Sequence, residues 1–346
     1  MRFKFVDGLR GVAALSVCLF HIGRDFLHIG FLHYGGLGVT VFFVLSGFVI
    51  SHSLVNKQIT PKYFASFAIK RSIRLDPAYW FAILLAILVL WIPSRLLDYK
   101  VSLPSFGDIL ANMFYLQGIL RVGNINSVFW TLCYEIQFYL VFCGLLLGSG
   151  YILGLKSTGN RNIALFSSLI GVSLLWPLCD LGNPYPGAFL NLWYLFLLGV
   201  FARWSIDSHL ALAVFCLVNA TLLIVSVVKG NATFLVASLT ALSLFVALRR
   251  QKMGSWLSWR WIQYIGMISY SLYLVHDIIG LYVRDTGLHL TRKIFGISSL
   301  AMNYLWCFIA LFVSILVAHI VFKLIEQPSH RLSKQLDINN LLKVNK

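Results

Sequence analysis

The sequence predicts an all-α, polytopic membrane protein with about ten transmembrane helices. Apolar residues make up 59% of its 346 positions and charged residues only 12%, about half of the usual charged fraction in soluble domains. The mean hydropathy is +0.82. Water could not solvate so apolar a surface, whereas a lipid bilayer accommodates it. These features exclude a soluble globular protein.

Each expected span is a run of roughly 20 apolar residues, the length that crosses the hydrocarbon core of a bilayer. The apolar stretch at 108–120 is too short to cross, so we expect it to be interfacial or re-entrant. The chain is interpreted as a single transmembrane domain over 1–346, with core spans between about 9 and 322 and a cytosolic tail at 323–346. The ten expected spans lie near residues 9–28, 35–53, 77–97, 127–148, 163–180, 188–202, 209–228, 232–248, 262–282 and 296–322.

The positions of Lys and Arg predict that both termini are cytosolic. With the N-terminus inside, alternation of the spans assigns 20 of the 28 Lys and Arg residues to the cytosolic side, as the positive-inside rule requires. We therefore attribute the net charge of +16 to topology and contact with membrane lipids, and expect no binding of nucleic acid. The first apolar run has no small-residue cleavage site, so we expect it to remain as a helix.

The cysteines give no indication of a metal site. All six lie within or beside apolar runs, and none forms a CxxC pair or a His/Cys cluster with the spacing of zinc ligands. We interpret them as small buried apolar residues.

Ionisable residues within spans are energetically costly and usually functional, which makes His21 and Arg10 candidates. Eleven residues at 100° each come within about 20° of three full turns, so both side chains share one helix face, about 16 Å apart along the axis. That face would carry a cation at the cytosolic edge and a titratable base deeper in the membrane. The alternative for His21 is a structural role in helix packing.

Glu135 is expected at a depth similar to that of His21, because their helices run in opposite directions. A carboxylate there could orient or charge-balance an imidazole base; the alternative is a structural carboxylate bonded to a neighbouring Tyr or Trp. Asp25, one turn beyond His21 on the same face, is a second candidate partner.

Arg71 and Arg74 lie three residues apart, just before the third expected span. On a helix they project from the same side and form a fork suited to phosphate oxygens. The alternative is ordinary positive-inside anchoring. Glycines such as Gly38 and Gly47 in the second span would allow a close approach of the first helix.

Six motifs in chain order resemble the acyltransferase-3 family of bacterial-type inner-membrane acyltransferases. The resemblance covers nearly the whole chain and implies a stand-alone, multi-pass acyltransferase domain of the bacterial inner (plasma) membrane, without the periplasmic esterase-like domain of many relatives. The motifs are DGLRG (7–11) with Arg10 and His21 eleven residues apart, FFVLSGF (42–48), KRSIRLDPAYW (70–80), WTLCYEIQFY (130–139), SYSLYLVH (269–276) and EQP (326–328).

The resemblance implies roles for individual residues. His21 matches the family's essential histidine, and Arg10 matches the basic residue paired with it. Arg71 and Arg74 match the RxxR motif associated with the acyl-CoA donor, and Glu135 matches the acidic residue of the WSLxxE motif.

These roles imply an acyl-CoA-dependent O-acyltransferase, with acetyl-CoA as the preferred donor substrate and no permanently bound cofactor. The nucleotide phosphates would dock on the arginines, and the pantetheine arm would thread between helices towards His21, which would act as general base or as transient acyl carrier. The acceptor would be a hydroxyl of a surface or lipid-linked glycan on the outer side, reaching the site past His276 and Asp277; a structural role is the alternative for these two. The family pattern is broken at Asp76, where a tyrosine is common.

A transporter or flippase of a polar or lipid-linked solute is the competing interpretation. Charges within ten spans are compatible with it, but it explains the paired arginines only through topology. The sequence also lacks an internal repeat, which weakens this interpretation.

Overall fold

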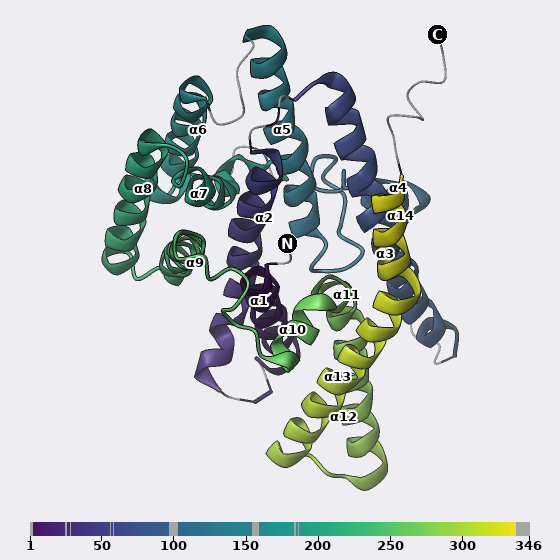
Figure 1. Ribbon diagram of the computed structural model, residues 1–346. Helices are drawn as coiled ribbons and strands as arrows, with labels where there is room; N and C mark the ends of the chain where they lie inside the picture. The colour runs from purple at the N-terminus through teal and green to yellow at the C-terminus, as the bar shows by residue number, and fades with distance from the viewer. Residues whose placement is uncertain are drawn as a thin grey trace, which may run out of the picture.

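The computed structural model describes residues 3–24, 26–27, 29–55, 57, 59–96, 103–153, 159–182, 185 and 187–336. Within these residues all regular secondary structure is helical (Figure 1). The helices form one bundle in which α1 (Lys4–Gly23) lies centrally, between α2 (Gly38–Leu54) and the C-terminal helices.

By length and composition, eight helices of the described part could cross a membrane. A ninth span is broken, because α10 (Arg260–Met267) meets the following helix, Ser269–Phe295, at a bend of 60°. The apolar helix Phe189–Trp204 is shorter than the others. The eight are α1, α2 with its 3₁₀ extension η1 (Gly30–Leu37), α3 (Pro61–Leu96), α5 (Trp130–Leu153), α6 (Asn160–Leu178), α8 (His209–Val228), α9 (Ala232–Arg249) and α13 (Leu300–Val321) with its continuation.

All ten predicted spans are therefore helical, but one of them is broken and one is short. The short one consists of η2 (Phe189–Leu192) and α7 (Trp193–Trp204), and every residue of α7 is buried. A helix that is apolar on all sides and covered by protein does not need to match the thickness of the bilayer.

Glycines allow α2 to pack closely on its neighbours. A Cβ atom on Gly47 would overlap the carbonyl oxygen of Phe196 in α7, and one on Gly199 would overlap that of Val44. A Cβ atom on Gly38 would likewise overlap the carbonyl oxygen of Ala13 in α1. The predicted close approach of the first two spans is confirmed.

A re-entrant segment connects α3 to α5. It consists of α4 (Phe106–Met113) and the loop at 114–129. The fully buried Asn112 holds the loop in place, because its side chain donates to the carbonyl oxygen of Gly123 (3.0 Å) and accepts from the backbone N–H of Ile125 (3.1 Å). The side chain thus takes the place of backbone hydrogen-bond partners in the loop. As a result α5 begins inside the protein, directly after the fully buried Phe129.

The C-terminal part is folded onto the core and is not a free tail as far as residue 335. The helix of α13 continues through a π-helical turn, η4 (Phe322–Glu326), into α14 (Gln327–Gln335), which packs on α3. The hydroxyl of Ser333 donates to the carbonyl oxygen of Lys70 at 2.8 Å. The predicted end of the last span, near residue 322, agrees with the end of α13 at Val321, but α14 is too polar to be recognised as a helix from hydropathy. Residues 337–346 lie outside the described part.

Candidate active site

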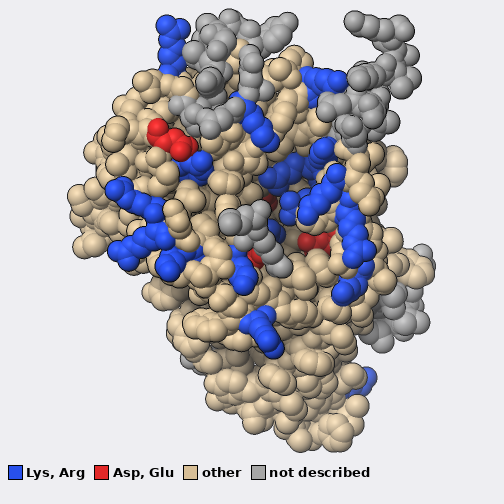
Figure 2. Space-filling view, viewed as in Figure 1, with Lys and Arg blue, Asp and Glu red and all other residues tan. Residues whose placement is uncertain are grey.

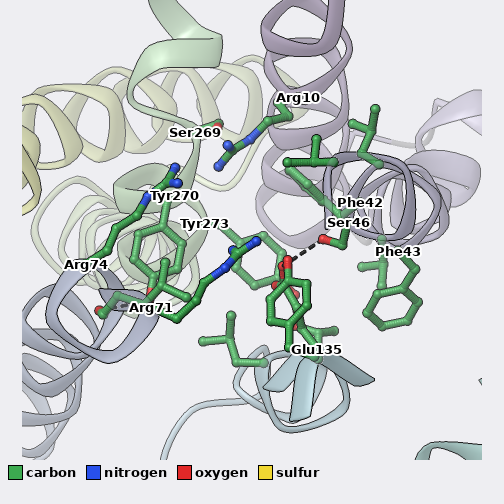
Figure 3. Close-up of a pocket in the computed structure, with 17 residues that line it drawn as sticks. Arg10, Phe42, Phe43, Ser46, Arg71, Arg74, Glu135, Ser269, Tyr270 and Tyr273 are labelled. Carbon is green, nitrogen blue, oxygen red and sulfur yellow. Dashed lines mark hydrogen bonds between the residues drawn. The ribbon is translucent and has the colours of Figure 1, made fainter. Parts of the chain in front are cut away.

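Three helices bring four of the predicted site residues together around one pocket. Arg10 comes from α1, Arg71 and Arg74 from α3, and Glu135 from α5, and all four line this central pocket (Figure 3). α3 is helical from Pro61 onward, so the two arginines of the RxxR motif project from the same side of a regular helix. The other walls are largely apolar and aromatic and include Val39, Phe42, Phe43, Leu45, Val49, Leu75, Leu132, Tyr139, Tyr270 and Tyr273.

No acidic side chain of the described residues forms an ion pair with the arginines of the central pocket, although Glu326 lies near enough to Arg10 and Arg74 to interact with them electrostatically. Neither Arg10, Arg71 nor Arg74 takes part in a hydrogen bond or ion pair with another described residue, whereas the guanidinium carbon of Arg71 lies 4.0 Å from the centre of the Tyr139 ring. Stacking on an aromatic ring orients a guanidinium group without neutralising it. The pocket therefore presents cationic groups that an anionic ligand could neutralise.

Glu135 lies in the central pocket and not beside His21. Its Oε1 atom accepts a hydrogen bond from the hydroxyl of Ser46 at 2.7 Å and another from the hydroxyl of Tyr139. The predicted contact with His21 is thus wrong, and the alternative of a carboxylate bonded to a tyrosine matches the observed contact. The error arose because the depth of His21 was counted from residue 28, whereas α1 ends at Gly23. His21 therefore lies in the last turn of its helix, and Glu135 lies in the second turn of α5.

Asp277 is the carboxylate that lies beside His21. Its Oδ1 atom is 3.3 Å from Nδ1 of His21. The other oxygen, Oδ2, accepts hydrogen bonds from the side-chain amide of Asn126 (3.0 Å) and the hydroxyl of Ser127 (2.7 Å), both in the re-entrant segment. These contacts fix the carboxylate beside Nδ1 of His21, where its negative charge favours the tautomer in which Nδ1 carries the proton. Asp25 lies outside the described residues.

His276 lies next to His21 and is buried, with 1% of its surface exposed. The two ring centres are 5.3 Å apart. Nδ1 of His276 lies 3.1 Å and 2.9 Å from the carbonyl oxygens of Leu272 and Tyr273, so this nitrogen carries the proton, because carbonyl oxygens only accept. The burial of His276 beside His21 fits the structural alternative better than the prediction that His276 and Asp277 line an outer entrance.

A π-helical turn places these two residues. It covers His276–Gly280 and follows α11 (Ser269–Val275) directly. A π-turn inserts one extra residue into a helix and changes the direction of the side chains that follow, and such turns are frequent at functional sites. Hydropathy gives no sign of it, so the pairing of Asp277 with His21 could not be seen in the sequence.

Arg284 is a further site residue that the sequence reasoning missed. It lies in α12 (Leu281–Phe295), and its Nη1 atom donates to the carbonyl oxygens of His21 (3.2 Å) and Ile22 (2.8 Å). It thereby satisfies carbonyl groups that the end of α1 leaves unpaired. Its buried guanidinium group also lies 4.1 Å from the ring centre of Phe26. The sequence assigned Arg284 to an outer connection, because the segment around it also carries Asp285, Arg292 and Lys293.

Aromatic side chains connect the central pocket to His21. The Tyr273 hydroxyl, at the pocket wall, lies 2.7 Å from the hydroxyl of Thr131. The ring of Tyr273 is 5.7 Å from that of His276, which contacts His21. Packed side chains thus link the wall of the central pocket to His21, which does not itself line that pocket.

The sequence model of a family described as the acyltransferase domain matches residues 3–323. The chain belongs to this acyltransferase family. The match includes every residue of the site described above.

Curated relatives of this acyltransferase are described as O-acetyltransferases. A putative peptidoglycan O-acetyltransferase of Bacillus subtilis is 26% identical over 314 residues, covering 78% of this chain and 47% of that protein. A peptidoglycan O-acetyltransferase of Listeria monocytogenes is 30% identical over 189 residues, covering 49% of this chain and 27% of that protein. The chain thus spans less than half the length of these relatives. No solved structure matches it.

The acyltransferase presents no arrangement of side chains for a metal ion in its described part, where no group of three or more His, Cys, Asp and Glu residues comes together. Asp76, the departure from the family pattern, does not line the central pocket. Its carboxylate accepts hydrogen bonds from the hydroxyls of Ser72 and of Tyr115, the latter at 2.9 Å. Asp76 therefore ties α3 to the re-entrant segment.

Proposed function

We propose that this protein transfers an acetyl group from cytosolic acetyl-CoA to a hydroxyl of a glycan on the other side of a bacterial inner membrane. The observation that carries the proposal is the central pocket, in which Arg10, Arg71 and Arg74 form no ion pair with another described residue and are surrounded by apolar and aromatic walls. His21 and Asp277 lie beyond Tyr273, at the wall of this pocket. Membership of the acyltransferase family supports the reaction class. The descriptions of the relatives support acetyl transfer to a glycan.

The donor fits the central pocket in charge and in shape. CoA is an anionic nucleotide joined through a pyrophosphate to a slender, uncharged pantetheine arm. Guanidinium groups bind phosphate oxygens through strong charge-assisted hydrogen bonds, and aromatic and apolar walls suit the arm. Arg10 and His21 lie on one face of α1, about 16 Å apart by helical rise, which matches the length of the arm. The thioester would then lie beside His21.

His21 would act as general base in direct transfer. With Nδ1 facing Asp277, the free Nε2 atom accepts the proton of the acceptor hydroxyl while that oxygen attacks the thioester carbonyl. The carbon–sulfur bond then breaks, and the CoA thiolate takes the proton back from the imidazolium. Asp277 stabilises the positive charge on the ring during this cycle. A 26% exposed side chain leaves His21 accessible to both substrates.

Binding of acetyl-CoA to the purified protein in detergent tests the donor. We expect wild type to bind acetyl-CoA and Arg71→Ala/Arg74→Ala to lose most of that affinity. We expect His21→Ala to bind acetyl-CoA normally and to transfer no radiolabelled acetyl group to a glycan acceptor. Failure of folded wild-type protein to bind acetyl-CoA would refute the proposed donor, and wild-type acetylation by His21→Ala would refute the role of the base.

A further inference from the structure

A second hollow adjoins the central pocket on the face shown in Figure 2. Lys and Arg side chains gather around it, and acidic side chains are visible within it. We call it the α14 groove. It measures about 660 Å³, within the usual range of about 300–1,000 Å³ for ligand pockets. Its lining residues are Asp7, Arg10, Arg74, Gly266, Met267, Phe322, Glu326, Gln327, His330, Arg331 and Lys334.

The α14 groove and the central pocket share two residues, Arg10 and Arg74. Their guanidinium groups therefore stand at the boundary between two compartments of different character. The central pocket is mainly apolar and aromatic, whereas the α14 groove is mainly polar and charged. A ligand that occupies both must have an anionic group at the boundary, an apolar part on one side and a polar part on the other.

Hydrogen bonds near both ends of α14 hold this helix beside the groove. At its start stands the π-helical turn η4. Glu326, the last residue of η4, accepts hydrogen bonds from the backbone N–H (3.2 Å) and the hydroxyl (2.6 Å) of Ser271. Glu326, His330 and Lys334 follow one another at four-residue intervals and therefore lie along one face of the helix. The bond between Ser333 and the carbonyl oxygen of Lys70 holds the far end of α14 against α3.

The α14 groove carries more positive than negative charge. Four Arg and Lys side chains line it, against two carboxyl groups, and the carboxyl group of Glu326 is already bonded to Ser271. Arg331 and Lys334 are exposed and make no hydrogen bond or ion pair with another described residue. These two side chains can therefore turn towards an anion in the groove at little cost.

We propose that the α14 groove binds the nucleotide end of CoA and that Arg331 and Lys334 bind its ribose 3′-phosphate. The inference rests on the proposed function, and the covalent structure of CoA carries it further. With the pantetheine arm in the central pocket and the pyrophosphate at Arg10 and Arg74, the nucleotide must lie beyond these arginines, which is where the groove is. The 3′-phosphate is the remaining anionic group of CoA, and Arg331 and Lys334 are the remaining cations of the groove.

The proposal makes the enzyme selective for CoA over dephospho-CoA, which lacks only the 3′-phosphate. The test measures the dissociation constants of both ligands for wild type and for Arg331→Ala/Lys334→Ala. We expect wild type to bind CoA about tenfold more tightly than dephospho-CoA, because charge-assisted bonds to one phosphate are lost. We expect the double variant to bind CoA about tenfold more weakly than wild type and dephospho-CoA as wild type does.

Arg250→Ala/Lys252→Ala is the matched control, since it removes the same charge from exposed residues outside the groove. We expect it to leave both constants unchanged. If Arg331→Ala/Lys334→Ala weakens the binding of CoA and of dephospho-CoA equally, or weakens neither, the assignment of the 3′-phosphate is overturned. Binding of CoA by wild type would still uphold the proposed donor in that case. If folded wild type binds neither ligand, the proposed donor fails as well. Should the double variant unfold, Arg331→Gln and Lys334→Gln are measured singly against the same two ligands.

Discussion

The imidazole of His21 and the carboxylate of Asp277 face each other at 3.3 Å, although they come from the first helix and from a π-turn near the end of the chain. Asp277 is fixed from its other side by Asn126 and Ser127. Three distant segments therefore assemble this imidazole–carboxylate pair, the proposed base and its orienting partner.

Replacing Asp277 with Asn should lower turnover by about 10²- to 10⁴-fold, the range associated with loss of general-base function. The amide cannot stabilise an imidazolium, and it can turn its NH₂ group towards Nδ1 and favour the wrong tautomer. The KM for acetyl-CoA should stay near the wild-type value, because Asp277 lies away from the arginines. Initial rates of acetyl transfer measure both quantities.

Asp180→Asn is the control for that experiment, since Asp180 is exposed and pairs only with Lys229 at the surface. It should leave the rate unchanged, because exposed ion pairs contribute little. Wild-type turnover in Asp277→Asn would show that His21 needs no carboxylate partner.

Glu135→Gln should act on donor binding and not on the chemical step. Glu135 holds the hydroxyl of Tyr139, on whose ring Arg71 stacks. We expect the KM for acetyl-CoA to rise several-fold and turnover at saturating donor to remain close to that of wild type. A fall in turnover comparable to that of Asp277→Asn, with an unchanged KM, would restore Glu135 as the partner of His21.

Arg284→Ala should destabilise the protein by about 1–3 kcal/mol, the cost of leaving buried polar groups without a partner. The carbonyl oxygen of His21 loses its donor in this variant, and that of Ile22 keeps only the weak thiol donor of Cys307. Thermal unfolding in detergent measures the effect. Arg292→Ala, an exposed position in the same helix, should leave the midpoint unchanged, and equal midpoints for both variants would contradict the capping role.

Gly199→Ala should destabilise the contact of α7 with α2, because the added methyl group would overlap the carbonyl oxygen of Val44. Overpacking of this kind typically costs about 1–3 kcal/mol. Gly144→Ala in α5 is the matched comparison, since its Cβ atom would meet nothing within 4 Å, and alanine favours a helix over glycine. The two variants should shift the unfolding midpoint in opposite directions; a stable Gly199→Ala would mean that the two helices can separate freely.

Thiol labelling should establish the orientation in the membrane. Lys229 and Lys252 lie just outside opposite ends of α9. After Cys179 and Cys216, the exposed cysteines of the described part, are changed to Ser, a membrane-impermeant maleimide should label Lys229→Cys on intact spheroplasts. Lys252→Cys should react only after the membrane is opened, and the reverse pattern would place both termini outside.

The sequence predicted the order of the helices well, because hydropathy reports directly on which segments leave water. All ten apolar runs are helical, and the short run at 108–120 lies in the re-entrant segment. The arginine residues were also grouped correctly, because Arg10, Arg71 and Arg74 line one pocket.

The partner of His21 could not be predicted in this way. Depth estimates assume that each span ends where its apolar run ends, and α1 instead ends at Gly23, which places His21 in its last turn. The orientation of Asp277 depends on a π-turn, which has no hydropathy signal. Helix α14 was missed for a related reason. A polar helix beside a charged groove is as rich in polar residues as a solvent-exposed tail, so composition does not distinguish the two.

The placement of Arg10 and His21 on one unbroken helix makes α1 a molecular ruler. Movements of neighbouring helices can change what surrounds these two residues, but not the interval between them. With CoA as the proposed donor, the distance between Arg10 and His21 fixes the position of the CoA sulfur atom, whichever acyl group that sulfur bears. Longer acyl chains would project past His21. The residues that set the preference for chain length are therefore separate from those that recognise the nucleotide, and the two properties can change independently within the family.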